Sequence, residues 1–175
     1  MTEEKKEPST GGEDSVFLKA KNDALRLLSF KPRSTQELRK RLKMKKYPDG
    51  ITDRVVDVFT KTGLLDDRKF AKLFANSRIY TRPTGRRQLE FDLKKSGVGE
   101  TIAAETLAGL EGYDEKQTAK DLVRNRFART KDVPDEKRKA RIFGFLKRRG
   151  FSQGVIFSVL SELFKEIEIN ENEGQ

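Results

Sequence analysis

The residues that could do chemistry in this 175-residue chain are basic, because the sequence contains neither histidine nor cysteine. That composition removes the commonest general base, any thiol nucleophile and the usual ligands of zinc. Asp66 and Asp67 are the one conspicuous acidic pair, and neighbouring carboxylates at a helix start cap the helix instead of facing each other. We therefore expect a protein that is not an enzyme and that holds no cofactor and no metal.

Lysine and arginine gather in three runs along the chain. Residues 34–46 hold six basic residues against one acid, residues 82–95 five against two, and residues 137–149 seven against none. Such a run is more often a solvated helix face than a binding site, but recurrence favours a binding role, and arginine suits phosphate or carboxylate. The candidate binding residues are Arg39, Lys40, Lys43, Arg82, Arg86, Arg87, Lys94, Arg138, Arg141, Lys147, Arg148 and Arg149.

The distribution of charge indicates a polyanionic partner. The net charge is +10, but residues 1–15 carry −3 and residues 162–175 carry −4, so the chain between them carries +17. A body this basic favours nucleic acid, or a protein surface built on nucleic acid. Phosphate contacts carry no sequence information. We therefore expect non-specific binding of single- and double-stranded DNA that falls steeply with salt.

The elements that position these runs are predicted to be helices in an internal repeat. Leu38 and Leu42 match Leu89 and Leu93 at an offset of 51 residues, and then Ile142 and Leu146 at an offset of 53. Periods of this length are typical of stacked helical units. The same offsets relate three residues of the next helix in each unit: Ile51, Val56 and Phe59, then Ile102, Leu107 and Leu110, then Val155, Leu160 and Leu163. The predicted fold is all-α, with three tandem three-helix repeats in an elongated array.

The expected boundaries follow from composition and helix signals. The repeats cover residues 16–66, 67–113 and 114–167, between disordered acidic tails at residues 1–15 and 168–175. The first helix should end before Pro32, because the residue that precedes a proline avoids the helical region. The basic runs lie at the same place in each repeat, so stacking would align them as a stripe. We expect charge reversal at Arg86 and Arg87 to remove binding without disturbing the fold.

Helix ends are marked by four capping signals. Ser34 and Glu37 have the spacing of a capping box, in which each side chain satisfies an N–H group at the helix start. Gly63 suits a left-handed helix end, and Asp66 and Asp67 should accept the N–H groups of the following first turn.

Three segments resemble the RecX family of bacterial regulators of the RecA recombinase. They are Ala24-x-x-Leu27-Leu28 with Arg33-Ser34-x-x-Glu37-Leu38, then Gly63-Leu64-Leu65-Asp66-Asp67-x-x-Phe70-Ala71, then Phe145-Leu146-x-Arg148-Arg149-Gly150-Phe151-Ser152. The resemblance spans about residues 20–165. It implies a curved array of repeats that lies in the groove of the RecA filament on DNA and restrains filament growth, strand exchange and coprotease activity.

Two other classes stay open from the sequence. A helix-turn-helix transcription factor or nucleoid protein would also pair helices through short turns, and a nucleic-acid enzyme is the least favoured because histidine and cysteine are missing. No apolar run reaches the length that spans a bilayer, and the acidic N-terminus does not resemble a signal peptide. We therefore expect a cytosolic monomer with no membrane partner.

Overall fold

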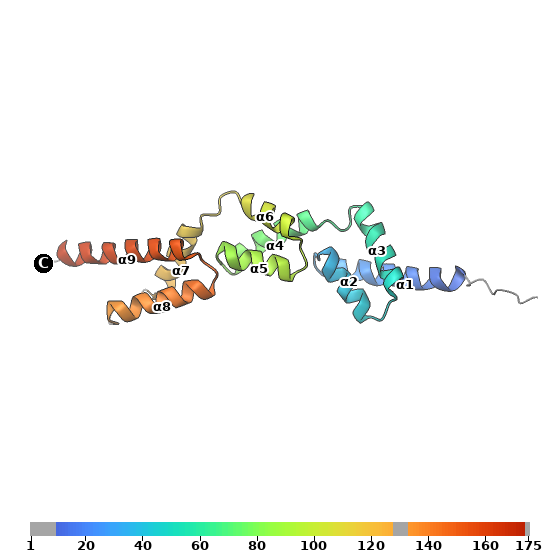
Figure 1. Cartoon of the computed structure of the whole chain (residues 1–175), viewed down its shortest axis with the longest axis horizontal. Coiled ribbons are helices and arrows are strands. Elements are labelled where there is room, and N and C mark those ends of the chain that lie inside the picture. Colours follow the sequence, from blue (N-terminus) through green and yellow to red (C-terminus); the bar gives the residue numbers. More distant parts are fainter. Residues whose placement is uncertain (1–9, 128–132, 174–175) are drawn as a thin grey trace, which may run out of the picture. The chain divides into compact units, whose positions relative to one another are not determined.

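The computed structural model describes residues 10–127 and 133–173, and every regular element in these ranges is a helix (Figure 1). The predicted all-α repeat fold is confirmed. The helices are α1 (Thr10–Phe30), α2 (Thr35–Met44), α3 (Asp49–Lys61), α4 (Asp67–Thr81), α5 (Arg86–Lys95), α6 (Glu100–Ala108), α7 (Glu115–Phe127), α8 (Asp135–Arg148) and α9 (Gln153–Glu173).

The helices belong to two compact units, each with a hydrophobic core of its own. Unit 1 runs to Ala71 and includes the turn Ser96–Gly99, while unit 2 comprises Lys72–Lys95 and the chain from Glu100 onward. Burial of apolar area is the main driving force that holds thin helical layers of this kind together. The core of unit 1 is built from α1, α2 and α3 around Phe59, Leu38 and Leu42, and that of unit 2 from α7, α8 and α9 around Ile142, Leu146 and Ile156.

Burial confirms the repeat register in the second helix of each repeat, whereas the predicted third-helix positions are only partly buried in the second and third repeats. Leu38, Leu89 and Ile142 are fully buried, as are Leu42, Leu93 and Leu146 at the next equivalent position. In the third helix of each repeat, two sets of equivalent positions are buried that the sequence did not reveal, because they include small or polar residues. They are Thr52, Ala103 and Ile156, followed one turn later by Val55, Thr106 and Val159. The predicted match at Leu110 is wrong as a helical position, since α6 ends at Ala108.

The first and last helices are longer than predicted. Helix α1 begins at Thr10 and α9 continues to Glu173, so parts of both expected tails are helical. Residues 1–9 and 174–175 of those tails lie outside the described residues. The end of α1 at Phe30 agrees with the proline rule, and Gly63 has the predicted left-handed φ of 73°.

Two of the predicted caps bond differently. Ser34 Oγ accepts the N–H of Glu37 at 3.0 Å as expected, but the Glu37 carboxylate pairs with Arg33 and Lys31 instead of closing a capping box. Asp66 Oδ1 accepts the first-turn N–H groups of Arg68 and Lys69 at 2.9 and 3.0 Å, as a helix cap should. The Asp67 carboxylate leaves its own helix and accepts a hydrogen bond from the start of α2.

That bond belongs to a contact that we call the first joint, in which the N-terminal end of α2 meets Asp67 and the turn Ser96–Gly97. The backbone N–H of Thr35 donates to Asp67 Oδ1 at 2.7 Å, and Ser34 Oγ donates to the carbonyl of Ser96. Gly97 has a φ of 85°, and a Cβ there would lie 2.3 Å from Gln36 Cβ. The close approach requires glycine.

Unit 2 contains an equivalent contact, the second joint, at the N-terminal end of α5. The backbone N–H of Arg86 donates to Glu115 Oε1 at 3.0 Å, and Thr84 Oγ1 donates to the carbonyl of Arg149 at 2.7 Å. Gly150 has a φ of 76° and packs against Gln88. In both joints the second helix of one repeat is capped by the first helix and the turn of the following repeat. Asp67 therefore caps α2 and not its own helix.

Candidate nucleic-acid interface

The predicted basic residues of unit 1 are engaged in surface ion pairs or exposed. The Arg39 guanidinium pairs with Asp53, and Lys43 Nζ lies 3.0 Å from Asp49 Oδ1. Lys40 is exposed on α2. Exposed pairs of this kind are worth at most about 1 kcal/mol each, so they do not prevent these side chains from meeting a stronger anion.

Two of the predicted residues in unit 2 have structural roles instead. Arg86 donates to the carbonyl of Leu107 at the C-terminal end of α6 and lies 5.5 Å from the ring centroid of Tyr113. Arg138 is buried, with Nη2 at 3.0 Å from Asp135 Oδ1 and its guanidinium 4.8 Å from the Phe164 ring. Charge reversal at Arg86 would remove both of its contacts, so we expect that change to disturb the fold as well as binding.

The other predicted residues of unit 2 are more accessible. Lys94 bridges Glu90 at 2.8 Å and Glu100 at 2.6 Å, and hydrogen bonding to Glu100, then to Glu90, raises the pKa of its ammonium group. The remaining exposed members are Arg82, Arg87, Arg141, Lys147 and Arg148.

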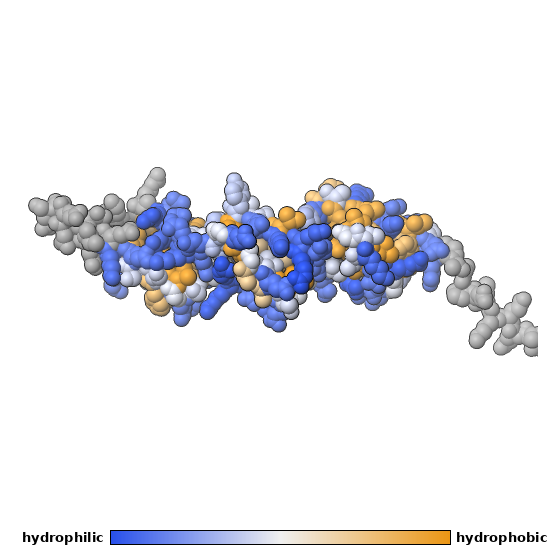
Figure 2. Space-filling view, turned by 90° about the horizontal axis from the view of Figure 1, so that it is seen from above, coloured by the Kyte–Doolittle hydropathy of each residue, from blue (hydrophilic) through white to orange (hydrophobic). Residues whose placement is uncertain are grey.

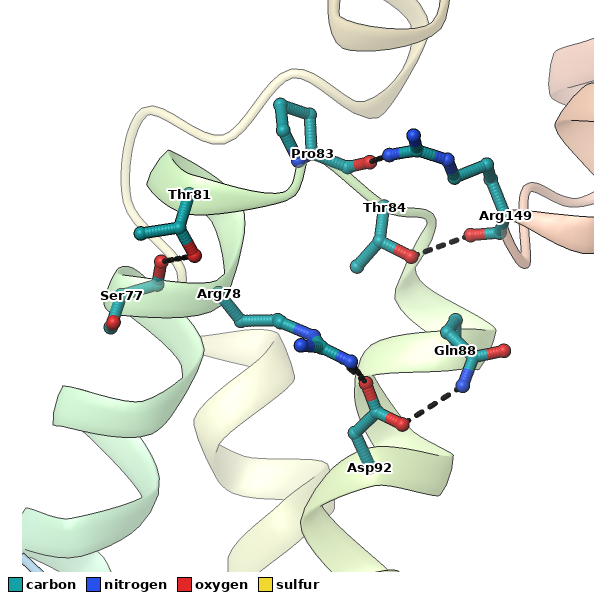
Figure 3. A network of polar contacts seen from close by, with 8 residues as sticks. All are labelled: Ser77, Arg78, Thr81, Pro83, Thr84, Gln88, Asp92 and Arg149. Carbon is teal, nitrogen blue, oxygen red and sulfur yellow. Dashed lines mark hydrogen bonds and ion pairs between the residues drawn. The ribbon is translucent and has the colours of Figure 1, made fainter.

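Arg149 is the centre of a cluster that the sequence only partly revealed. Its Nη1 donates to the carbonyl of Pro83 at 2.8 Å, and its own carbonyl accepts from Thr84 and from the backbone N–H of Gly85 (Figure 3). These bonds tie the turn after α8 to the loop between α4 and α5. The arginine cluster, as we call it, consists of Arg78, Arg82, Arg126 and Arg149.

The positive charges of Arg82, Arg126 and Arg78 lie close enough to Arg149 to act on its guanidinium group. The pKa of Arg149 is lowered first by partial burial and then by the positive charges of Arg82, Arg126 and Arg78. Arg126 and Arg149 also share one aromatic ring, because their guanidinium carbons lie 4.9 and 5.3 Å from the centroid of Phe145. Cation–π contact holds both groups over that ring.

One carboxylate offsets part of this charge. Arg78 donates to Asp92 Oδ2 through Nε at 3.0 Å and Nη2 at 2.6 Å, while Gln88 Nε2 donates to Asp92 Oδ1 at 2.9 Å (Figure 3). Within the described part of the chain, no acidic side chain forms an ion pair with Arg82, Arg126 or Arg149. A phosphate group suits the fork of a guanidinium group that has no carboxylate partner.

The structure brings together Arg82 and Arg149 from the predicted set and adds Arg78 and Arg126. Arg82 directly follows the last residue of α4 and lies four positions after Arg78, and that spacing could have linked the two. Nothing in the sequence placed Arg126 beside them, because that contact depends on how α7 packs against α8.

Figure 2 shows hydrophilic residues over most of the face it presents, with hydrophobic residues in smaller patches.

Comparison with family models gives a match in every repeat. Residues 20–57 match the first three-helix domain of RecX, residues 66–107 the second and residues 113–160 the third. The chain belongs to the RecX family. The predicted resemblance is confirmed, and the three matched domains come in the order of the three repeats. Family membership supports a general role as a regulator of RecA.

Curated relatives agree over most of their length. The chain is 35% identical over 149 residues to a regulatory protein RecX of Thermobifida fusca, covering 85% of this chain and 80% of that relative. It is 38% identical over 154 residues to the one of Mycolicibacterium smegmatis, covering 85% and 82%. Both relatives are named as regulatory proteins and not as enzymes.

Solved structures share the fold. The crystal structure of RecX from Lactobacillus salivarius aligns with a TM-score of 0.78 at 20% identity, covering 86% of this chain and 97% of that one. A second crystal structure of a regulatory protein RecX aligns with a TM-score of 0.79 at 22% identity, covering 91% and 80%. In residues 10–127 and 133–173, no helix is both long enough and apolar enough to cross a membrane.

Proposed function

We propose that this protein regulates RecA by binding along the groove of the RecA filament on DNA, where it restrains filament extension, strand exchange and coprotease activity. It does so as a cytoplasmic monomer. The observation that carries the proposal is the arginine cluster, in which Asp92 pairs with Arg78 and, among the described residues, no carboxylate pairs with Arg82, Arg126 or Arg149. The uncompensated charge supplies a non-specific contact to the DNA backbone, and the family supplies RecA as the protein partner.

The cluster is suited to positioning on phosphates and not to reading bases. Arg149 is held by Pro83 and Phe145, so less side-chain entropy is lost when it meets an anion. Arg82 and Arg126 are exposed, Arg126 with its guanidinium group over the Phe145 ring, so both can meet the backbone of either single- or double-stranded DNA. Each phosphate contact that is lost should lower the dependence of log affinity on log salt by about 1.

The test compares two double charge reversals with the same change in net charge. Arg82→Glu with Arg126→Glu alters the cluster, while Lys19→Glu with Lys61→Glu alters exposed residues of α1 and α3. DNA affinity is measured across a salt series. RecA ATPase activity and filament length on single-stranded DNA are followed with substoichiometric amounts of each variant. We expect the cluster variant to lose DNA affinity and inhibition, and the control to retain most of both.

Equal inhibition by the two variants would show that the cluster is only a solvated surface. Preference for one duplex beyond about a thousandfold over random sequence would instead favour a transcription factor.

A further inference from the structure

The third repeat carries an aromatic groove between α8 and α9, on a surface that the arginine cluster does not use. Ala140 and Phe143 line it from α8, and Phe157, Leu160 and Phe164 line it from α9. Its volume is about 720 Å³. The rings of Phe143 and Phe157 lie 5.7 Å apart, and Phe157 is 58% exposed. A large exposed aromatic side chain in a hollow marks an interaction site more often than a lone surface residue does.

The repeats themselves show that the fold does not require these aromatic residues. By the same offsets of 51 and 53 residues, Phe143 corresponds to Arg39 and Phe157 to Asp53 of the first repeat. Arg39 and Asp53 form an ion pair there. The third repeat therefore has an aromatic pair where the first repeat has an ion pair. It also has Phe164 where the first repeat has Thr60.

The charges around the groove select an acidic occupant. Lys139 Nζ lies 5.0 Å from the centroid of Phe164, and Lys147 Nζ lies 5.9 Å from that of Phe143. Lys165 also lines the groove, and Glu136, the one carboxylate among the described side chains that line it, already pairs with Lys139 at 3.3 Å. After Glu136, the wall formed by α8 lies in the run of residues 137–149, which has seven basic residues and no acid. Complementary charge at such a rim favours association and selects the partner.

A protein helix fits this surface better than a nucleobase does. Stacking of bases needs open ring faces, but cations already lie over Phe143 and Phe164, and Leu160 adds an aliphatic floor. An amphipathic helix instead inserts apolar side chains spaced three and four residues apart into such a groove. We propose that the groove docks an acidic amphipathic helix of a partner protein. This goes beyond the proposed function, whose DNA contact is made by the arginine cluster.

The test uses a fluorescent helical peptide of about four turns with leucine on one face and glutamate on the other. A matched peptide carries lysine in place of glutamate. Binding to the full chain is followed by fluorescence anisotropy. We expect saturable binding of the glutamate peptide and binding of the lysine peptide that is weaker by about tenfold or more.

The matched protein variants are Phe157→Glu and Phe91→Glu, because Phe91 on α5 has the same exposure of 58%. Only the first should abolish peptide binding, and circular dichroism should show both to be folded. Failure to bind the glutamate peptide, or equal binding of both peptides, would overturn the proposal. Loss of oligothymidine binding in Phe157→Glu without loss of peptide binding would make the groove a nucleic-acid surface. Self-association that this variant abolishes would make the occupant a second copy.

Discussion

The two joints connect equivalent helices and turns, but the atoms packed against the glycine of the turn differ between them. A Cβ at Gly97 would lie 2.3 Å from Gln36 Cβ and 2.7 Å from Gln36 Cγ, whereas a Cβ at Gly150 would lie 2.4 Å from Gln88 Cβ and 2.5 Å from the backbone N of Gln88. Gly85 is also pressed on the Gly150 carbonyl, where a Cβ would lie 2.2 Å from the oxygen. The Cβ of each glutamine is fixed by its own backbone and cannot rotate away, but the second joint adds backbone atoms that the first does not meet. Both connections therefore require glycine, and the second has backbone obstacles that its equivalent in the same chain lacks.

The largest difference between the joints should come from their left-handed glycines. We expect Gly150→Ala to lower the free energy of unfolding by about 3 kcal/mol or more, since left-handed strain adds to overpacking against backbone. Gly97→Ala has the same strain but meets side-chain atoms, so about 2 kcal/mol is expected. Gly63→Ala is the control, because its φ is 73° and no atom lies within 4 Å of its Cβ position.

Chemical denaturation measures all three variants, and exchange of the Gly85 amide proton, which donates to Arg149 O at 2.8 Å, reports on the second joint alone. If Gly97→Ala cost as much as Gly150→Ala, the distinction between side-chain and backbone obstacles would fail.

Arg86 anchors the second joint through its side chain. The equivalent residue of the first joint is Thr35. We expect Arg86→Ala to cost about 2 kcal/mol, because it removes a charged donor from the Leu107 carbonyl and a cation from the Tyr113 ring. Arg87→Ala and Thr35→Ala should each stay within about 0.5 kcal/mol, as surface changes usually do. Thermal unfolding of the three variants is the measurement, and equal melting temperatures would remove Arg86 from the structural residues.

The carboxylate caps should differ less. Asp67→Ala leaves the N–H of Thr35 without its acceptor, and Glu115→Ala does the same to Arg86, so each should cost about 1 kcal/mol. The Asp67 bond is the shorter, 2.7 against 3.0 Å, and we expect its loss to be the greater. Since the two caps belong to different units, their effects should add. A marked deviation from additivity in the double variant would show that the joints are coupled.

The smallest expected difference between the joints is a pH dependence of stability that Tyr113 gives to the second joint. Burial raises the pKa of Tyr113 to about 12, and its hydroxyl donates to the Thr84 carbonyl in the second joint. A raised pKa stabilises the folded state fully below the ordinary value near 10 and loses that contribution as pH rises toward 12. We expect the wild type to lose more stability than Tyr113→Phe between these values. Parallel pH profiles of the two proteins would contradict this role.

The repeat register and the helix ends could be read from the sequence because they depend on local spacing. Large apolar residues at Leu38, Leu89 and Ile142 mark the buried column directly, and Pro32 and Gly63 mark ends through their own backbone preferences. The burial of Thr52 and Ala103 was not predicted, because small and polar residues do not by themselves indicate a buried position. The extent of α1 and α9 was underestimated, because a polar composition predicts disorder even where a helix continues.

The binding residues divide in the same way. The sequence by itself determined the excess of positive charge, the absence of histidine and cysteine, and the three-fold recurrence of the basic runs. Only the tertiary structure decided that Arg86 and Arg138 support the fold, that Asp67 caps a helix 32 positions earlier in the chain, and that Arg126 joins Arg149 over one ring. The reason is physical: charge and helical period are properties of single residues and their near neighbours. The partner of a guanidinium or carboxylate is set by which distant helices pack together.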